Sequence, residues 1–316
     1  MSLKKGKVVK GLGGLYEVLT EDRSERIVCR AKGVFRHTDL KLLIGDNVEI
    51  EQGEIADQTV ISKILPRKNQ LIRPPLANLD MLFVVVAAAY PSPALSTIDK
   101  LIAIAEYNGI EVIPVFTKKD LCESKQYEEI YKKIGYDVFS VSSVTGEGIS
   151  ELESFIEKKL TNGICAAFAG ASGVGKSTLL NSLFPDLSLE TGDISQKIER
   201  GKHTTRHVEI FEVNEKGGSC GFLADTPGFS LLDFVHFDFF TLDDLLPLFK
   251  EFSRYTGDCR YSDCTHTKES ECAVVQAVAR GEVEKSRHEC YCELYDILKK
   301  KKSYSYIDKA DKFTKK

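Results

Sequence analysis

Short apolar runs separated by glycines fill the first part of the chain. They lie at residues 7–9, 16–19, 26–29, 47–50 and 59–61 and are rich in residues that favour β-strands. Five short strands within about 60 residues predict a small β-barrel domain over residues 1–66. The strand count favours an OB-type barrel, which commonly binds oligonucleotides. An SH3-like barrel, or a barrel with a purely structural role, would give the same pattern.

A stretch containing three prolines, at residues 66–75, marks a change of pattern. Because proline disfavours helix, we expect a hinge between domains here. The runs beyond it are continuously apolar, as in strands buried on both faces, and helical patterns at residues 98–107 and 152–160 alternate with them. These runs occupy residues 81–88, 112–116, 138–141, 164–169 and 222–224. The alternation predicts an α/β domain with a doubly wound parallel sheet over residues 67–232.

The β-type runs stop after about residue 232. Five apolar residues then follow at helical spacing, which would place them on one face of a helix. They are Leu242, Leu245, Leu246, Phe249 and Phe252. We therefore predict a third, mainly helical domain over residues 233–316, and a multidomain protein as a whole.

Composition agrees with a globular chain of two or three domains. Of the 316 residues, 42% are hydrophobic and 28% are charged, as is usual for such proteins. The first residues lack the apolar run of a signal peptide, and no stretch reaches the roughly 18 apolar residues of a membrane span. We expect a cytoplasmic protein with no membrane partner.

Charge is nearly balanced but unevenly distributed. The 43 Lys and Arg residues against 47 Asp and Glu give a net charge of −4, which argues against a general polyanion binder. Residues 299–316, in contrast, contain eight lysines and two aspartates. This basic end is either a solvated helix end or a contact with RNA.

A phosphate-binding loop is the strongest chemical motif. It follows the strand at 164–169 and opens a helix at 177–183, as G-x-x-x-x-G-K-[ST] loops do. Its residues are Gly170, Ala171, Ser172, Gly173, Val174, Gly175, Lys176, Ser177 and Thr178. Glycines let backbone N–H groups surround phosphate oxygens, and the helix N-terminus attracts the same anion. Lys176 would contact the β- and γ-phosphates, and Ser177 would ligate Mg²⁺.

A second motif indicates a guanine base. Thr117, Lys118, Lys119 and Asp120 follow the strand at 112–116 and resemble the N-K-x-D signature of GTPases. A carboxylate at Asp120 can accept hydrogen bonds from guanine N1–H and the exocyclic amine, which adenine does not offer on that edge. The stem of Lys118 would pack along the base. Threonine stands where asparagine is commoner, so contacts around the base are expected to differ.

Ser142, Ser143 and Val144 follow the strand at 138–141 and resemble the S-A-x loop that closes over guanine. A polar turn would have the same composition. Three motifs that each follow a buried strand lie where doubly wound sheets bind nucleotides, so the combination favours GTP.

Two further segments resemble GTPase switches. Residues 225–228 resemble the D-x-x-G element, in which Asp225 would hold Mg²⁺ through a water and the Gly228 N–H would meet the γ-phosphate. Residues 201–207 form a polar stretch before a strand at 208–213, and either Thr204 or Thr205 is the expected switch threonine. Such loops become ordered only with the γ-phosphate and Mg²⁺ present.

The residue that orients the attacking water is not evident. Phe229 occupies the position after Gly228, where many GTPases have a glutamine, so intrinsic turnover should be slow or depend on a partner. His203 is our candidate for positioning water, because a neutral imidazole nitrogen can accept a proton. The alternative is a histidine that contacts only backbone or RNA.

Clustered cysteines indicate a metal. The nine cysteines are an odd number, and Cys259, Cys264, His266 and Cys272 have the spacing Cys-x4-Cys-x-His-x5-Cys. Four such ligands suit one closed, structural Zn²⁺ site without an open position for catalysis. The alternative is reduced free thiols. Surplus ligands are available at His288, Cys290 and Cys292, but the 259–272 set closes the shorter loop.

The guanine motifs precede the phosphate loop, whereas they follow it in ordinary GTPases. A circular permutation preserves the sheet, because packing depends on which strands adjoin. This order, with a barrel before it and the cysteine–histidine cluster after it, resembles the bacterial ribosome small-subunit-dependent GTPase A family over nearly the whole chain. The resemblance implies a GTPase that acts late in assembly of the small ribosomal subunit, is stimulated by that subunit and binds ribosomal RNA through its flanking domains.

We therefore expect a GTP-hydrolysing assembly factor that uses GTP or GDP, Mg²⁺ and one Zn²⁺, and that is a monomer away from the ribosome. Two rivals remain. One is a P-loop ATPase, which Asp120 would distinguish. The other is a non-hydrolysing RNA-binding module in which GTP only fixes a conformation.

Overall fold

Five short strands form a closed barrel at the N-terminus, as predicted. They are β1 (Ser2–Leu12), β2 (Leu15–Thr20), β3 (Arg26–Ala31), β4 (Asn47–Gln52) and β5 (Val60–Ile64). The strand order is β1-β2-β3-β5-β4, and β4 pairs back to β1 to close the ring. Side chains alternate between the two faces of a strand, so every second one fills the interior. Fully buried examples are Val8, Val18, Val48, Ile50 and Ile61.

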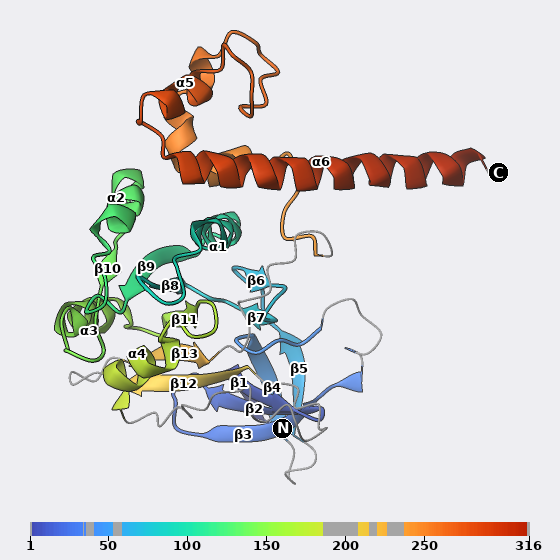
Figure 1. The fold of residues 1–316 in the computed structure, drawn as a ribbon. Coiled ribbons are helices and arrows are strands. Elements are labelled where there is room, and N and C mark those ends of the chain that lie inside the picture. The colour runs from blue at the N-terminus through green and yellow to red at the C-terminus, as the bar shows by residue number, and fades with distance from the viewer. Residues whose placement is uncertain are drawn as a thin grey trace, which may run out of the picture.

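The computed structural model describes residues 2–33, 35, 41–52, 59–185, 208–214, 220–225 and 237–314. The barrel lies beside a larger sheet, and the C-terminal helix α6 (Lys285–Thr314) crosses above α1 (Leu95–Tyr107) on the far side of that sheet (Figure 1).

The predicted doubly wound sheet is present in the middle of the chain. Its strands are β8 (Met81–Ala87), β9 (Glu111–Thr117), β10 (Phe139–Ser140), β11 (Cys165–Ala169), β12 (Glu209–Asn214) and β13 (Cys220–Asp225). The order is β10-β9-β8-β11-β13-β12, with all neighbours parallel except β12 and β13. Every residue of β8 and β11 is buried, because helices cover both faces.

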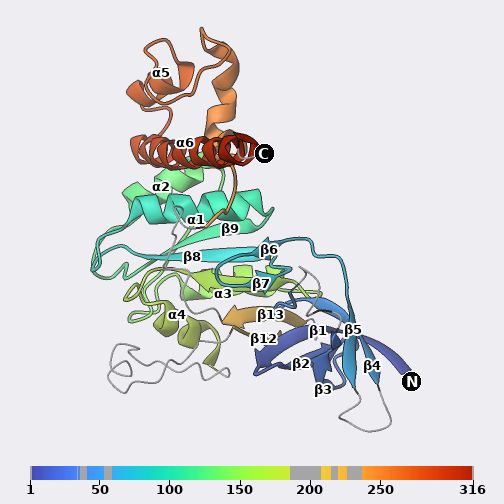
Figure 2. The same cartoon turned by 90° about the vertical axis from the view of Figure 1, so that its right-hand side faces the viewer.

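Helices cover the two faces of this sheet in pairs. Helices α1 and α2 (Lys125–Ile134) lie on one face, and α3 (Ile149–Lys159) and α4 (Lys176–Leu183) lie on the other (Figure 2). Helices α1, α2 and α3 each return the chain to the start of the next strand, so the parallel strands end at the same edge. The carboxyl ends of β8, β9, β10, β11 and β13 therefore gather on one side.

The barrel and the sheet are joined edge to edge. Strand β1 pairs antiparallel with β12, with Lys10 opposite Glu209, and all eleven strands form one continuous order. The Lys10 ammonium lies 2.8 Å from the Glu209 carboxylate across this seam. A second ion pair joins Arg26 of β3 to Glu212 of β12 at 3.3 Å.

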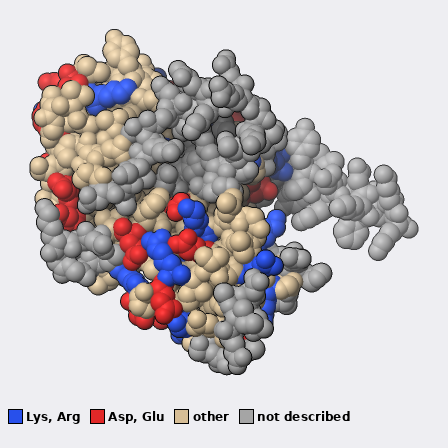
Figure 3. All heavy atoms as spheres, turned by 90° about the horizontal axis from the view of Figure 1, so that it is seen from below, with Lys and Arg blue, Asp and Glu red and all other residues tan. Residues whose placement is uncertain are grey.

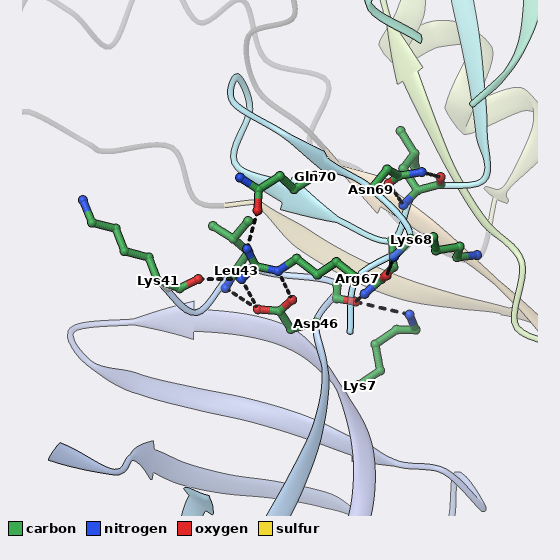
Figure 4. Close-up of polar contacts among 11 residues, drawn as sticks. Lys7, Lys41, Leu43, Asp46, Arg67, Lys68, Asn69 and Gln70 are labelled. Carbon is green, nitrogen blue, oxygen red and sulfur yellow. Dashed lines mark hydrogen bonds and ion pairs between the residues drawn. The ribbon is translucent and has the colours of Figure 1, made fainter. Parts of the chain in front are cut away.

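The stretch predicted as a hinge is held firmly in place. It forms a small hairpin of β6 (Gln70–Leu71) and β7 (Leu76–Ala77). Arg67 Nε and Nη2 donate to the two oxygens of the fully buried Asp46 carboxylate at 2.6 and 2.8 Å (Figure 4). Asn69 exchanges two hydrogen bonds with the backbone of Leu79, at 2.7 and 3.0 Å. A bidentate arginine–carboxylate contact fixes the relative orientation of its two partners, so this linker holds the barrel against the sheet.

One helix prediction was wrong. The apolar positions 242–252 do not form a single α-helix but a chain of short 3₁₀ turns, η5 (Leu246–Leu248), η6 (Lys250–Arg254) and η7 (Thr256–Asp258). Pro247 lacks the N–H that a continuing helix needs and restricts the residue before it. The side chains still face inward, and Leu245, Phe249 and Phe252 are buried. Beyond them lie α5 (Ala273–Ala279) and the 30-residue α6.

A buried ion cluster attaches α6 to the sheet's helices. The Arg287 side chain is 0% exposed and lies between Asp99 of α1, at 3.2 Å, and Glu251 of η6, at 2.7 Å. The Tyr131 hydroxyl of α2 donates to the same Asp99 carboxylate at 3.0 Å. An unpaired charge would be costly at this depth, so the cluster requires α6, α1 and η6 to pack together.

Charges on the surface are mixed. Basic and acidic side chains intermingle on the described part of the face below the sheet (Figure 3), and the barrel wall carries exposed pairs such as Lys4 with Glu25 and Arg26 with Glu17. Over the described residues, no helix combines the length and the apolar character that a membrane crossing needs.

Candidate functional site

The sequence motifs for phosphate and guanine lie at one edge of the sheet. Ala169, which precedes the phosphate loop, is in register with Val84, and Thr117 is in register with Ala87. Ser140, two residues before Ser142, is in register with Phe116. The two guanine motifs therefore follow the adjacent strands β9 and β10, and β8 lies between β9 and the strand β11 that precedes the phosphate loop, so all three motifs reach one edge of the sheet.

The phosphate loop fits closely between β11 and α4. At Gly170 a Cβ atom would lie 2.4 Å from the Val85 carbonyl oxygen, so no larger residue fits there without a shift of backbone. Gly175 has a φ of 90° and forms the N-cap of α4, a conformation that favours glycine. The N–H groups of the first turn of α4 have no partner within a helix, and they face the loop at which an anion would bind.

Thr117 faces the phosphate loop and not an open base site. Its side chain is buried, and its hydroxyl lies 2.5 Å from the Val174 carbonyl oxygen and 3.2 Å from that of Val86. A hydroxyl has one proton to donate, and the shorter contact is to Val174. Threonine in place of asparagine thus joins β9 to the phosphate loop.

Lys118 and Lys119 point in different directions. The Lys118 ammonium donates to the Gly173 carbonyl at 2.8 Å and also to the Tyr90 carbonyl. Lys118 therefore bridges the phosphate loop and the loop after β8. Lys119 instead forms an exposed ion pair with Glu147 at 2.7 Å, where the hydrogen bond to Glu147 raises the pKa of Lys119. The contact with Tyr90 is a feature that no motif in the sequence indicates.

Asp120 is oriented by the loop that resembles S-A-x. The buried Ser142 hydroxyl donates to Asp120 Oδ1 at 2.6 Å. Ser142 Oγ itself accepts from the N–H groups of Val144 and Thr145, at 3.3 and 3.1 Å. Because Ser142 Oγ accepts these two hydrogen bonds, its own proton points to Asp120, and the carboxylate is held in one orientation. Ser143 lies in the turn that follows and is half-buried.

Several predicted residues lie outside what the structure describes. His203, Thr204, Thr205 and Gly228 belong to segments beyond the described ranges. Asp225 is described by its backbone, as the last residue of β13, opposite Glu209 of β12. Ala167 of β11 is in register with Ala224, so Asp225 reaches the same edge as the phosphate loop.

The four predicted zinc ligands come together. The ligand atoms of Cys259, Cys264, His266 and Cys272 all lie within 4.8 Å of one another. The two sulfurs of Cys259 and Cys272 are 3.9 Å apart, and His266 Nδ1 lies 3.5 and 3.4 Å from them.

These distances fit a tetrahedral metal. Zinc bonds of about 2.3 Å to sulfur and 2.0 Å to nitrogen imply separations of about 3.8 Å between sulfurs and about 3.5 Å from sulfur to nitrogen. Burial lowers the pKa of His266, which keeps the imidazole neutral and able to ligate near pH 7. The residues present therefore fit one Zn²⁺ with no open position. The surplus candidates His288, Cys290 and Cys292 are not part of this cluster.

Family models match most of the chain. Residues 64–235 match the RsgA GTPase model, and residues 5–60 match the model of the RsgA N-terminal domain. The chain is 40% identical to the small ribosomal subunit biogenesis GTPase RsgA of Agathobacter rectalis over 315 residues, covering 95% of this chain and 99% of that protein. It is also 40% identical to the protein of the same name from Bacillus velezensis, with the same shares covered.

Solved structures agree with this similarity. The crystal structure of YjeQ from Thermotoga maritima superposes with a TM-score of 0.75 and 34% identity, over 94% of this chain and 99% of that one. YloQ, described as a circularly permuted GTPase, gives a TM-score of 0.72 and 33% identity over 95% and 96% of the two chains.

Proposed function

Because the chain belongs to the RsgA GTPase family and is therefore a GTP hydrolase, we propose that it serves in biogenesis of the small ribosomal subunit and that this subunit stimulates its GTP hydrolysis. The observation that carries the proposal is the similarity to biogenesis GTPases along almost the whole length, flanking regions included. A shared nucleotide fold alone would not support a ribosomal role.

The phosphate loop would hold the nucleotide's phosphates. Backbone N–H groups between Gly170 and Thr178 would surround the phosphate oxygens, and Lys176 would neutralise charge on the β- and γ-phosphates. Ser177 and Asp225 would hold Mg²⁺, which supplies positive charge to the phosphates during transfer. Two observations support this assignment: the phosphate loop follows the carboxyl end of β11, and β11 runs parallel to and in register with β13.

Asp120 would read the base. Its carboxylate would accept from guanine N1–H and the exocyclic amine, while the stem of Lys118 would cover one face of the ring. The hydrogen bond from Ser142 supports the role, because it presets the carboxylate. Thr117 would support the phosphate loop through its hydroxyl, and Lys119 and Ser143 would line the surroundings of the base.

Hydrolysis would depend on residues outside the described ranges. We propose that His203 positions the attacking water, that Thr204 or Thr205 senses the γ-phosphate with Mg²⁺, and that the Gly228 N–H contacts that phosphate. A stimulating partner would then act on these residues.

The flanking regions would contact ribosomal RNA. The proposed contacts are the barrel, the zinc loop at residues 259–272 and the lysines at residues 299–316, with one Zn²⁺ as a structural ion.

We also propose that the functional domains span residues 1–66, 67–232 and 233–316, and that the protein is a cytoplasmic monomer away from the ribosome. The limits of the two family-model matches support the first boundary.

The test is steady-state hydrolysis of GTP and ATP by the purified protein, alone and with added small or large ribosomal subunits. We expect GTP turnover to rise with small subunits only. Equal turnover of both nucleotides, unaffected by ribosomes, would reject the ribosomal role and favour a general P-loop enzyme. GTP binding without turnover under every condition would favour the non-hydrolysing module.

A further inference from the structure

The first turns of α6 contact two different parts of the molecule. Arg287, Cys290 and Glu293 face α1 and its neighbours: Cys290 Sγ lies 3.8 Å from the Ser96 carbonyl, and Glu293 accepts from the Ser96 hydroxyl at 3.0 Å. His288, Tyr291 and Cys292 lie on the side that meets the zinc loop. One short segment of helix thus lies between the GTPase domain and the metal ligands.

Side chains of α6 hold three successive carbonyls of the zinc loop. His288 Nε2 donates to the His266 carbonyl at 2.8 Å, and the Tyr291 hydroxyl donates to the Thr265 carbonyl at 3.1 Å. Cys292 Sγ lies 3.7 Å from the Thr267 carbonyl. Residues 288, 291 and 292 have the spacing that places them on one side of a helix, so the three contacts form a single row.

The zinc loop needs such support. His266 has a φ of 57°, a left-handed conformation that costs a non-glycine residue of order 1 kcal/mol and persists only where neighbours fix it. Glu269 holds the other side of the loop, accepting from the N–H groups of Thr265 and Thr267 at 3.0 and 3.1 Å. The loop is therefore fixed from both sides by groups that are not ligands.

We propose that His288 and Tyr291 are positioning residues for the zinc centre, holding the 265–267 backbone in its ligating shape through the carbonyls of His266 and Thr265. This inference rests on the proposed zinc site. His288 is assigned this role and not that of a ligand, because its Nε2 is used by the carbonyl contact and its ring lies outside the four-ligand cluster. Groups around metal ligands commonly change metal affinity when removed.

The experiment measures zinc release from the full-length protein to a chromogenic chelator, after zinc content has been determined by elemental analysis. The variants are Tyr291→Phe, which removes only the hydroxyl and keeps the ring against Phe249 and Phe252, and His288→Ala. His288→Gln restores an N–H donor. Glu293→Ala is the matched control, since it removes contacts to Ser96 and Lys100 on the other side of the same helix.

We expect Tyr291→Phe and His288→Ala to release zinc about tenfold faster than wild type, with His288→Gln closer to wild type and Glu293→Ala unchanged. Folded zinc-loaded variants that release zinc at the wild-type rate would overturn the proposal, as would equal acceleration by Glu293→Ala. A wild-type protein that holds no zinc would overturn the zinc site itself, which distinguishes the two failures.

Discussion

The Thr117 hydroxyl donates a hydrogen bond to the Val174 carbonyl and so joins the element expected to read the base to the loop expected to hold the phosphates. Lys118 makes a parallel contact with the neighbouring Gly173 carbonyl. Two adjacent residues of one strand end thus support two adjacent carbonyls of the phosphate loop. The nucleotide's two ends would bind to a single connected unit.

Removing this hydroxyl should weaken binding of GTP and GDP equally. Thr117→Val keeps the shape but leaves a buried carbonyl without its partner, which costs about 1 to 3 kcal/mol. We expect an affinity loss of about tenfold for both nucleotides by isothermal titration, an unchanged preference for guanine over adenine, and recovery in Thr117→Ser. A changed base preference would show instead that Thr117 contacts the base.

Asp120→Asn should change base preference. The amide replaces one acceptor by a donor that faces the donors on guanine, so we expect GTP affinity to fall by at least about a hundredfold, since charged hydrogen bonds contribute about 1.5 to 3 kcal/mol each. Xanthosine triphosphate, which has a carbonyl in place of the amine, should bind this variant better than GTP does. The control is Glu111→Gln, because Glu111 begins the strand β9 that leads to Asp120, and its side chain pairs at the surface with Lys159. Unchanged GTP affinity would remove Asp120 from the site.

Zinc should be lost when a ligand is removed. Cys264→Ser is expected to lower zinc content from one ion per chain to near zero and to lower the thermal unfolding temperature, because metal binding contributes directly to folding of its site. Cys122→Ser should retain the ion, since Cys122 is exposed and lies outside the cluster. Elemental analysis and thermal unfolding measure both effects. Full zinc content in the Cys264 variant would place the metal elsewhere.

The buried Arg287 should be essential for stability. Arg287→Ala leaves Asp99 and Glu251 without their cation, and removal of one partner of a buried ion cluster costs about 3 to 5 kcal/mol. Urea unfolding should show this loss in the free energy of unfolding. Arg280→Ala removes an exposed pair with Glu282, and because solvent screens such pairs we expect a much smaller loss than for Arg287→Ala. Similar losses in the two variants would contradict this account of the cluster.

Lys7, at the seam between barrel and sheet, should lower the free energy of unfolding by an amount that depends on pH. Burial is the main cause that lowers the pKa of Lys7, with Lys68 adding to it and Cys165, Asp80 and Asp46 opposing it. Below the lowered pKa the charged lysine destabilises the fold. As the pH rises from that value to the unfolded value near 10.5, the unfolded chain binds more protons and the penalty disappears.

Lys7→Met should therefore be more stable than wild type at pH 7, and the difference should shrink as pH approaches 10.5. Denaturant unfolding of both proteins across this range measures the difference. A gap that stays constant with pH would mean that the proton on Lys7 is not its cause. Lys5→Met, at an exposed position two residues earlier in the same strand, controls for loss of a positive charge.

Buried strands, strand-end motifs and the zinc ligands could be predicted because each leaves a local pattern. Continuous apolar runs predicted β8 and β11, and the ligand spacing predicted the cluster around His266. Other features depend on distant contacts. Nothing near Thr117 in the sequence indicates that its hydroxyl turns to Val174, because that direction is set by a loop 57 residues later. The helical spacing of the apolar positions also predicted one helix across Pro247, but the missing N–H of this proline breaks that helix.

The pairing of β1 with β12 bears on how the protein could be divided. Without residues 1–66, β12 would become the outermost strand of the remaining sheet and would lose its pairing with β1, which is made at Lys10 and Glu209. Exposed strand edges of this kind pair with other chains and promote aggregation. A fragment that begins at residue 67 would therefore tend to self-associate although it keeps every residue proposed to bind the nucleotide, and poor solubility of such a fragment would reflect its uncovered edge.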